Sequence, residues 1–194
     1  MKTDAITLEN GVTVNYVGNA ELLDGAYANR RYAFAGARRG LTESSRAWTR
    51  QMVDVLDANK HILVSGLAIG TDTDAHVRAL KNGVPQVVVL PSGVNNVYPR
   101  QNRRLARSIV KNGGVLISEY QNNASPRRNT FLERNKLIID LSVLLVVNQF
   151  NLKSGTRNTV EHAKNDGKLI VVQKGDYTGN KYIIKDARYR TLVK

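Results

Sequence analysis

The sequence predicts a doubly wound α/β fold, in which helices cover both faces of a parallel sheet and a short β segment is added at the start. Six short segments are almost entirely apolar and bounded by glycine or proline, as is typical of parallel strands buried on both faces. Helical stretches separate them, and this alternation favours a doubly wound sheet. The expected strands are Tyr32–Ala35, Ile62–Ser65, Gln86–Leu90, Val115–Ser118, Val143–Val147 and Leu169–Val172.

The stretches between these strands carry apolar residues at helical spacing. One buried helix face is expected from residues at i, i+4, i+7 and i+8, namely Trp48, Met52, Val55 and Leu56. A second helix is expected to bury Ala75, Ala79 and Leu80. Gly83 should end that helix, because glycine readily adopts the left-handed conformation that closes a helix.

The two ends of the chain differ from this central pattern. Apolar and polar residues alternate over residues 6–16 around Asn10-Gly11, which predicts a hairpin at one edge of the sheet. We therefore divide the chain into a hairpin-like extension over residues 1–30 and a single α/β unit over residues 31–194. The polar tail has one apolar patch, Tyr182–Ile184, and is expected to fold back on the sheet.

Composition excludes several classes of protein. The 194 residues are enough for one sizeable domain, and no apolar run reaches the ~20 residues of a membrane span. The first residues lack the apolar core of a signal peptide, so we expect a cytoplasmic protein with no membrane partner. The chain has no cysteine, which excludes disulfides, thiol catalysis and cysteine metal sites.

The charge of the chain is its strongest compositional signal. Lysine and arginine number 29 against 16 aspartate and glutamate, a formal net charge of +13. Such an excess suggests a polyanionic partner, and nucleic acid is the leading candidate because the charge is clustered. The alternative is a basic surface that serves solubility alone.

Two glycine-bearing turns follow neighbouring strands. Ser65 ends one strand, and Gly66 and Gly70 occupy the turn before the next helix. In an open α/β sheet such turns lie at the carboxyl ends of the strands, where ligands bind. We expect the N–H groups of Gly66, Gly70 and the helix start to face an anion such as a phosphate. The first strand likewise ends at Gly36, and Arg38 just after it should reach this region, unless it is simply an exposed turn arginine beside Arg39.

A helix expected after Tyr98-Pro99 has two unlike faces. Arginines at i, i+3, i+4 and i+7 form one stripe without an interleaved acid, and they are Arg100, Arg103, Arg104 and Arg107. Like charges at this spacing repel, and a phosphate backbone would remove that cost. A solvated helix face is the alternative. Asn102 lies at the start of the helix, where its amide presents itself to a ligand or caps the helix.

Two further clusters suit phosphates and bases. The segment from Pro126 to Lys136 combines basic residues with Phe131, as in proteins that bind single-stranded nucleic acid by stacking and cation contacts. The alternative is that Phe131 packs on the sheet. Lys153-Ser154-Gly155-Thr156 precedes a helix and resembles an anion-binding helix start.

No catalytic, metal or cofactor site is expected. The three histidines do not fall at metal-ligand spacing with carboxylates. Asp72 and Asp74 are better placed to cap a helix than to form an acid/base pair, and His76 is expected to be a packing or hydrogen-bonding residue. A Walker A motif is absent, so ATP hydrolysis is not indicated.

Taken in order, these motifs resemble the DNA-processing protein A (DprA/Smf) family over about residues 30–187. The matching segments are Gly36-Ala-Arg38, Val64 to His76, Leu90 to Asn102, Gly114 to Glu119, Arg134-Asn135, Ser154 to Thr159, Gly179-Asn180 and Ile183 to Asp186. The resemblance implies an extended Rossmann-like domain that binds single-stranded DNA, forms a homodimer and assists RecA loading in natural transformation. It places a positively charged pocket at Arg38, the Asn102 turn, residues 134–136 and residues 154–156.

The chain also departs from the family pattern. A short hairpin stands where the family has a helical domain, and no winged-helix domain is expected. The first motif continues Arg39-Gly-Leu-Thr-Glu instead of the usual Ser and Tyr-Gly. A phage or mobile-element origin and a role outside transformation therefore stay open. The alternatives are a module that binds a small or signalling nucleotide, and a Lonely Guy-type nucleotide phosphoribohydrolase, which would require Glu161 to reach the sugar.

The complete prediction is a non-enzymatic protein that binds single-stranded DNA, with Phe131 as the candidate for base stacking. The residues expected to bind DNA or phosphate are Gly36, Arg38, Ser65, Gly66, Gly70, Asn102, Arg103, Arg134, Asn135, Lys136, Lys153, Ser154, Gly155 and Thr156.

Overall fold

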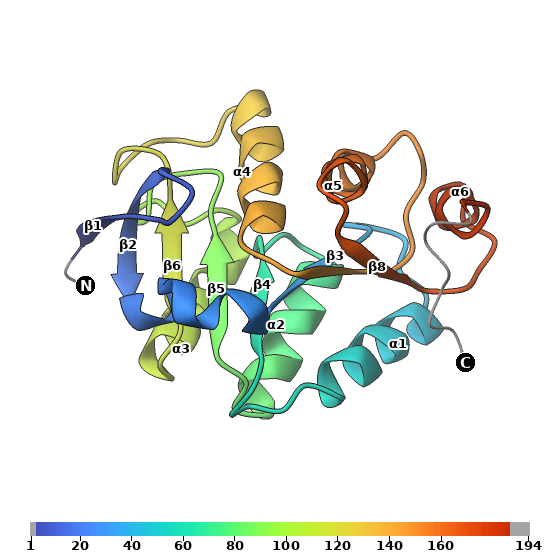
Figure 1. The fold of residues 1–194 in the computed structure, drawn as a ribbon, viewed down its shortest axis with the longest axis horizontal. Helices are drawn as coiled ribbons and strands as arrows, with labels where there is room; N and C mark the ends of the chain where they lie inside the picture. The colour runs from blue at the N-terminus through green and yellow to red at the C-terminus, as the bar shows by residue number, and fades with distance from the viewer. Residues whose placement is uncertain (1–2, 187–194) are drawn as a thin grey trace.

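A computed structural model describes residues 3–186, which form one eight-stranded sheet between two layers of helices (Figure 1). The strand order is β1-β2-β6-β5-β4-β3-β7-β8. The strands from β3 to β8 are parallel, which confirms the predicted doubly wound α/β sheet. Their bounds are Arg31–Ala35 (β3), Ile62–Ser65 (β4), Gln86–Val89 (β5), Val115–Ser118 (β6), Leu144–Val147 (β7) and Leu169–Val172 (β8).

All six predicted strands are present, and their ends agree with the prediction to within one residue. Every residue of β4, β5 and β6 is buried, which explains why these strands read as continuous apolar runs without alternation. The parallel arrangement brings the carboxyl ends of β3, β4 and β5 to one edge of the sheet. That edge is where the loops of the candidate site meet.

The predicted hairpin at the start of the chain is confirmed. Strand β1 (Asp4–Thr7) pairs antiparallel with β2 (Thr13–Gly18), and Gly11 in the turn has a φ of +80°. Strand β2 in turn pairs antiparallel with β6, so the hairpin extends one edge of the sheet. Two short 3₁₀ helices, η1 (Ala20–Leu23) and η2 (Gly25–Arg30), then lead back to β3.

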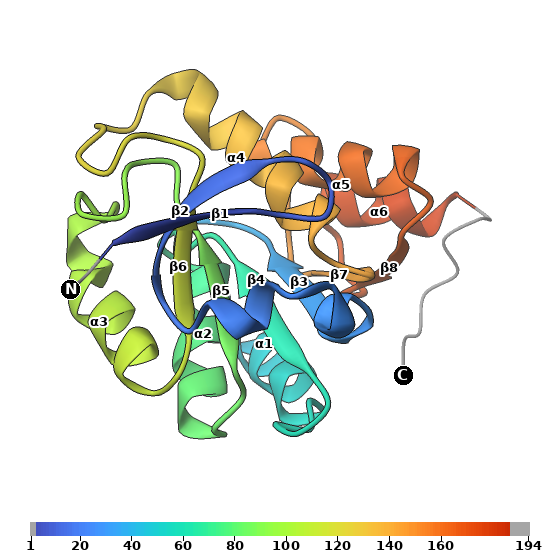
Figure 2. The same cartoon turned by 60° about the vertical axis from the view of Figure 1, so that its left-hand side comes forward.

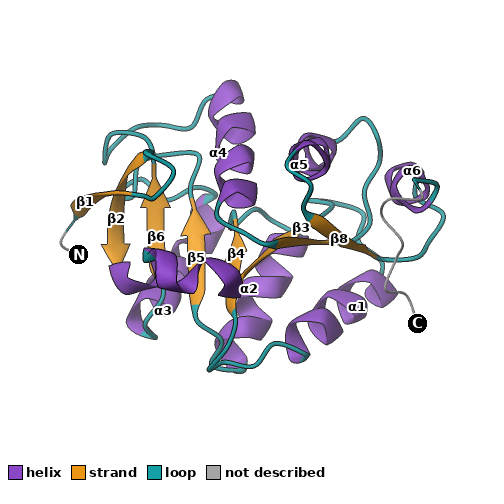
Figure 3. Ribbon diagram, viewed as in Figure 1, coloured by secondary structure: helices purple, strands orange, loops and turns teal. Residues whose placement is uncertain are grey.

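Helices cover both faces of the sheet, as Figure 2 and the helix ribbons of Figure 3 show. On one face lie α1 (Glu43–Asp54), α2 (Thr71–Lys81) and α3 (Arg103–Lys111). On the other lie α4 (Arg128–Asp140), α5 (Gly155–Asn165) and α6 (Thr178–Ile184). The predicted return of the tail is confirmed as far as residue 186, because Ile183 of α6 is buried in the core; residues 187–194 lie outside the described part.

The buried face of α1 differs in part from the prediction. Val55 is 71% exposed, because the helix ends at Asp54 and the next residue turns away from the sheet. The fully buried positions of α1 are instead Ser45, Thr49 and Val53, with Trp48 and Met52 packed at the side. On α2 the prediction is confirmed for Ala75 and Ala79, which are fully buried, and for Gly83, which closes the helix with a φ of +70°; Leu80 is only half-buried. The apolar periodicity does not reveal this face of α1, where the amide of buried Asn148 donates to the Ser45 carbonyl and to Oγ1 of Thr49.

Candidate nucleic-acid site

A cleft opens at the carboxyl edge of the sheet, between the loops that follow β3, β4 and β5 and the first turn of α4. Its apolar lining comes from Ile69, Pro91, Tyr98, Pro99 and Phe131, and its cationic lining from Arg38, Arg39 and Arg134. Of the large apolar residues, Ile69 and Tyr98 are among the most exposed in the described part of the chain. The cleft therefore offers an apolar surface with three guanidinium groups around it.

Two aromatic rings and one arginine form the wall of this cleft. The Arg38 guanidinium lies over the Phe131 ring at 5.2 Å from its centroid. Tyr98 meets Phe131 edge-on, with ring centroids 5.6 Å apart and an interplanar angle of 76°. Phe131 belongs to none of the buried clusters that form the core, unlike Ile138 and Leu141. The structure thus places Phe131 beside a cation in an open cleft, where a flat apolar ligand can reach it.

Arg134 forms the base of the cleft and is only 2% exposed. Its Nη1 donates to the Val89 carbonyl at 3.1 Å, and its Nε has no hydrogen-bond partner among the described residues. Burial lowers the pKa of Arg134 to about 10, while Asp72 raises this pKa and Arg38 lowers it. The guanidinium is therefore charged at neutral pH, yet no carboxylate of the described residues forms an ion pair with it.

The glycine turn after β4 is arranged differently from the prediction. The N–H groups of Gly66 and Ala68 donate to Oδ2 of Asp72, at 3.2 and 3.1 Å. The Thr71 N–H donates to the carbonyl of Ala37 at 3.1 Å. The expectation that the Gly66 N–H faces an anionic ligand is wrong, because a carboxylate in the first turn of α2 already takes that place and suits the helix dipole.

Two other predicted ligand groups also face inward. The Asn102 amide donates to the Leu67 carbonyl and to Oγ1 of Thr73, both at 2.8 Å. Leu67 has a φ of +61°, a conformation that is costly for a branched side chain. The Ser65 hydroxyl is fully buried and donates to the Phe34 carbonyl at 2.7 Å. Asn102 and Ser65 therefore position the loops of the cleft, and neither side chain points into it.

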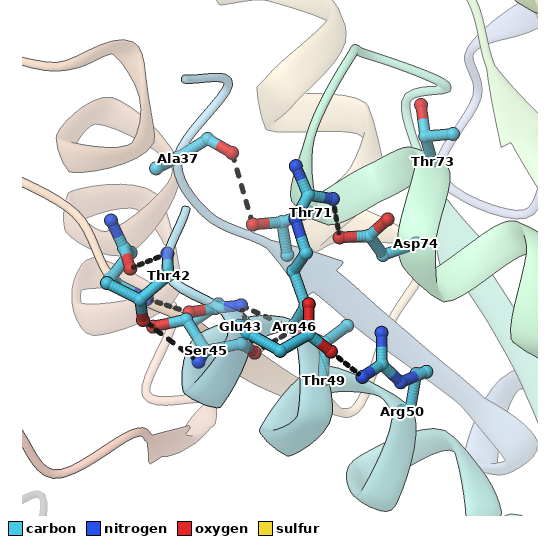
Figure 4. A network of polar contacts seen from close by, with 12 residues as sticks. Ala37, Thr42, Glu43, Ser45, Arg46, Thr49, Arg50, Thr71, Thr73 and Asp74 are labelled. Carbon is cyan, nitrogen blue, oxygen red and sulfur yellow. Dashed lines mark hydrogen bonds and ion pairs between the residues drawn. The ribbon is translucent and has the colours of Figure 1, made fainter. Parts of the chain in front are cut away.

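The loop that carries Arg38 is fixed from both sides. Oγ1 of Thr71 donates to the Ala37 carbonyl at 3.2 Å, as Figure 4 shows, and Oγ1 of Thr156 donates to the Gly36 carbonyl at 2.8 Å. A side chain at Gly36 would crowd Thr71 and Asn148, and one at Gly70 would overlap the Ala37 carbonyl. An ion pair of 2.6 Å between Arg46 and Asp74 joins α1 to α2 beside this loop (Figure 4). The backbone of Arg38 is thus held rigidly while its side chain stays exposed.

A second hollow lies on the far side of the Arg38 loop, at the start of α5. It is lined by Arg38, Arg39, Ser154, Gly155, Thr156 and Tyr177. No side chain caps this helix start, and Oγ of Ser154 is buried without a partner among the described residues. The structure therefore brings the predicted residues 154–156 next to Arg38, in a hollow whose positive helix end suits a phosphate.

Comparison with known proteins identifies the family. The model of the family described as DNA recombination-mediator protein A matches residues 9–190. The chain belongs to this family. It is 31% identical over 159 residues to the DNA processing protein DprA of Streptococcus pneumoniae, covering 82% of this chain and 54% of that protein. It is 36% identical over 122 residues to Protein Smf of Synechocystis, covering 63% of this chain and 30% of that protein.

A solved structure supports the same assignment. The structure of Helicobacter pylori DNA processing protein A, described for its single-stranded DNA binding mode, has a TM-score of 0.86 and 25% identity. It covers 100% of this chain and 92% of that one. The chain spans about a third to a half of the curated DprA and Smf relatives it matches first.

Several predicted residues lie outside the cleft of this DprA-family fold. Lys136 points along α4 to an ion pair with Asp140 at 2.8 Å. Arg103 donates to the Val97 carbonyl and to Oδ1 of Asn96, both at 3.2 Å, and does not line the cleft. Asn135 is buried and lines a smaller hollow beneath Arg134, and Lys153 is exposed next to the start of α5.

Tyr98 and Ile69 line the cleft and Asp72 closes the glycine loop, and none of these roles was predicted from the sequence. One pattern in the sequence could have identified both lining residues. Each is a large apolar residue in a turn, directly before a glycine or a proline. Neither residue fits the helix or strand periodicity of its neighbours.

The described residues contain neither a metal-binding cluster nor a membrane-spanning helix. No group of three or more histidine, cysteine, aspartate or glutamate residues within positions 3–186 is arranged to hold a metal ion. His76 is fully buried and its Nδ1 lies 2.8 Å from the Gln86 amide, as expected of a hydrogen-bonded packing residue. Every helix in the described part of the chain is too short or too polar to cross a bilayer.

Proposed function

We propose that this protein binds single-stranded DNA in the cleft and acts as a recombination mediator. The observation that carries the proposal is the buried guanidinium of Arg134 at the base of a cleft with aromatic walls, which forms no ion pair with a carboxylate of residues 3–186 and leaves its Nε without a hydrogen bond there. A buried charge without a partner is unfavourable, and a bound phosphate would supply the missing anion. Membership of the DNA recombination-mediator family and the single-stranded DNA binding mode described for the Helicobacter pylori protein support the same role.

The cleft suits an unpaired base better than a duplex. Phe131 and Tyr98 present ring surface to the opening, and in a duplex the base faces are already stacked on one another. In this arrangement Phe131 stacks on a base, and Arg38, Arg39 and Arg134 contact the flanking phosphates. A neighbouring phosphate occupies the second hollow at the start of α5, near Lys153.

The test is fluorescence anisotropy with a labelled 30-nucleotide single strand, comparing wild type, Arg38→Ala and Arg50→Ala. Arg50 is the matched control because it is an arginine on α1 whose ion pair with Glu43 lies away from the cleft. We expect Arg38→Ala to weaken binding by about tenfold or more, the effect of losing one charge-assisted contact. Arg50→Ala should bind like the wild type. Equal binding by both variants would contradict the proposed site.

A small nucleotide is the second candidate ligand, because the hollow at the start of α5 joins two arginines to a helix start that no side chain caps. A mononucleotide that competes with the oligonucleotide at micromolar concentration would favour this alternative. The phosphoribohydrolase reading has less support, since Glu161 lies 3.5 Å from Arg157 and lines neither the cleft nor the second hollow.

Three further features of the proposed role are inferred from membership of the family. RecA loading, a homodimer and a cytoplasmic location are proposed on that ground, with residues 31–194 as the DNA-binding unit and residues 1–30 as its extension. The segment from Phe131 to Leu145 is mostly core, because Leu137, Ile138 and Ile139 are buried, and Leu132 is its exposed apolar side chain. Sedimentation of the wild type and Leu132→Lys would test whether this side chain contributes to a dimer.

A further inference from the structure

The outward face of α3 and its preceding turn carries four exposed cations. They are Arg100, Arg104, Arg107 and Lys111, and none forms an ion pair with a carboxylate of the described residues. Residues at i, i+3 and i+4 on a helix are neighbours, so these positive charges repel one another. We call these four residues the α3 basic face. A face made only of cations is a source of unfavourable energy unless an anion lies on it.

Arg103 belongs to the same stripe in sequence but not in structure. Its guanidinium is drawn back to the loop before the helix, where the Val97 carbonyl and the Asn96 side chain accept its hydrogen bonds. The fold therefore gives one arginine of the stripe a structural contact and leaves the other three pointing to solvent. The α3 basic face is therefore a set of exposed arginines on one side of the helix and not a random scatter of positive charge.

The α3 basic face begins where the cleft ends. Tyr98 and Pro99 line the cleft, and Arg100 follows them directly in the chain. Tyr98 is 41% exposed and stands between Phe131 and the start of the face. The Asn102 amide also ties this turn to the Leu67 carbonyl in the glycine loop of the cleft, so the two surfaces are fixed relative to each other. Figure 2 shows α3 leading away from the carboxyl edge along the outside of the sheet.

We propose that the α3 basic face binds the continuation of the same single strand as it leaves the cleft over Tyr98. This inference rests on the proposed function. The occupant is the phosphate backbone, because the face has cations but no large apolar side chain to hold a base or a protein segment. From Arg100 to Arg107 the face is roughly 10 Å long, enough for consecutive phosphates of one strand to meet several cations.

The test compares a tetranucleotide, dT4, chosen to fill the cleft, with a 25-nucleotide strand, dT25. The variant is Arg100→Gln/Arg104→Gln/Arg107→Gln, since glutamine keeps helix propensity and removes charge. Its matched control is Lys60→Gln/Lys81→Gln/Lys168→Gln, which removes the same charge from the end of α2 (Lys81) and from positions just before β4 and β8, at the opposite edge of the sheet. Binding is measured by anisotropy, and by competition for dT4, across a salt series.

We expect the α3 variant to bind dT25 about tenfold more weakly than the control variant and to lose about 2 from the salt slope, given ~0.7 per phosphate contact on a single strand. Binding of dT4 should be unchanged. Equal dT25 affinity and slope in the two variants would overturn the inference, and so would an equal loss on a 25-base-pair duplex. Arg38→Ala separates the two proposals, because failure to weaken dT4 would count against the cleft and not against the α3 basic face.

Discussion

Arg134 depends on the absence of a side chain at Gly66. A Cβ atom at Gly66 would overlap Nη1 of Arg134, so the guanidinium reaches its position only because residue 66 is glycine. The sequence analysis assigned Gly66 to a phosphate-binding turn, yet its backbone N–H is used by Asp72. Glycine is needed at this position for the space it leaves, and that space is filled by the cation that we propose binds DNA.

Gly66→Ala should therefore displace Arg134 and weaken DNA binding by about tenfold, a change of ~1.4 kcal/mol in binding free energy. The overlap should also lower the free energy of unfolding by about 1 to 3 kcal/mol. Anisotropy and urea unfolding measure the two effects. Gly83→Ala is the control, because it strains a φ of +70° at the end of α2 with open space around it. If the control lost as much DNA affinity as Gly66→Ala, general destabilisation would explain the loss.

At the scale of elements, α2 is joined to β5 by a buried polar pair. His76 on α2 is fully buried and meets the Gln86 amide of β5 at 2.8 Å, and its Nε2 has no partner among the described residues. Burial lowers the pKa of His76, while Gln86 and Asp72 raise this pKa and Arg134 lowers it. The ring is therefore neutral in the folded protein at neutral pH.

This pairing predicts a loss of stability in mild acid. As the pH falls below the ordinary histidine pKa of about 6.5, His76 becomes protonated in the unfolded chain but stays neutral in the folded protein. The free energy of unfolding should then fall by up to about 1.4 kcal/mol per pH unit. Urea unfolding between pH 7.5 and 5 measures this slope, and His76→Gln should reduce it. An identical slope in the variant would show that other groups, such as the carboxylates, cause the loss.

The elements also show what sequence patterns can and cannot predict. Strands such as β4 and β5 were predicted because their all-apolar runs follow directly from burial on both faces. The buried face of α1 was partly mispredicted, since it faces the Asn148 amide, which donates to the Ser45 carbonyl and to Oγ1 of Thr49, and no apolar periodicity reveals such contacts. At the site, Arg38 and Phe131 were predicted from residue type and strand end. The inward turn of Asn102 and Ser65 depends on partners from distant segments, which a linear pattern does not contain.

Over the whole molecule, three groups of cations follow one another around the carboxyl edge of the sheet. The cleft supplies Arg38, Arg39 and Arg134, the start of α5 adds Lys153, and the α3 basic face continues beyond Tyr98. These groups account for part of the 29 lysines and arginines of the chain. This arrangement favours a long strand over a single nucleotide, because only a strand meets all of these cations together.

This distribution predicts a steep dependence of binding on salt. Seven cations should give a slope of about −5 in a plot of log affinity against log salt concentration, at ~0.7 per phosphate contact. They are the three arginines of the cleft, Lys153 at the start of α5, and Arg100, Arg104 and Arg107. Anisotropy with dT25 between 50 and 300 mM potassium chloride measures the slope. A slope near −1 would mean that most of these cations contact solvent rather than DNA.

The order of strands in the sheet determines when the binding surface forms during folding. Strands β3 and β7 lie side by side, with Phe34 in register with Val146, although they come from opposite halves of the chain. The loop after β3 is held by Thr156, just beyond β7, and by Thr71, just beyond β4. Pairing of strands so distant in sequence raises the contact order and is expected to be slow. A chain that has only begun to fold, or a fragment that stops before β7, therefore lacks the surface that would capture DNA.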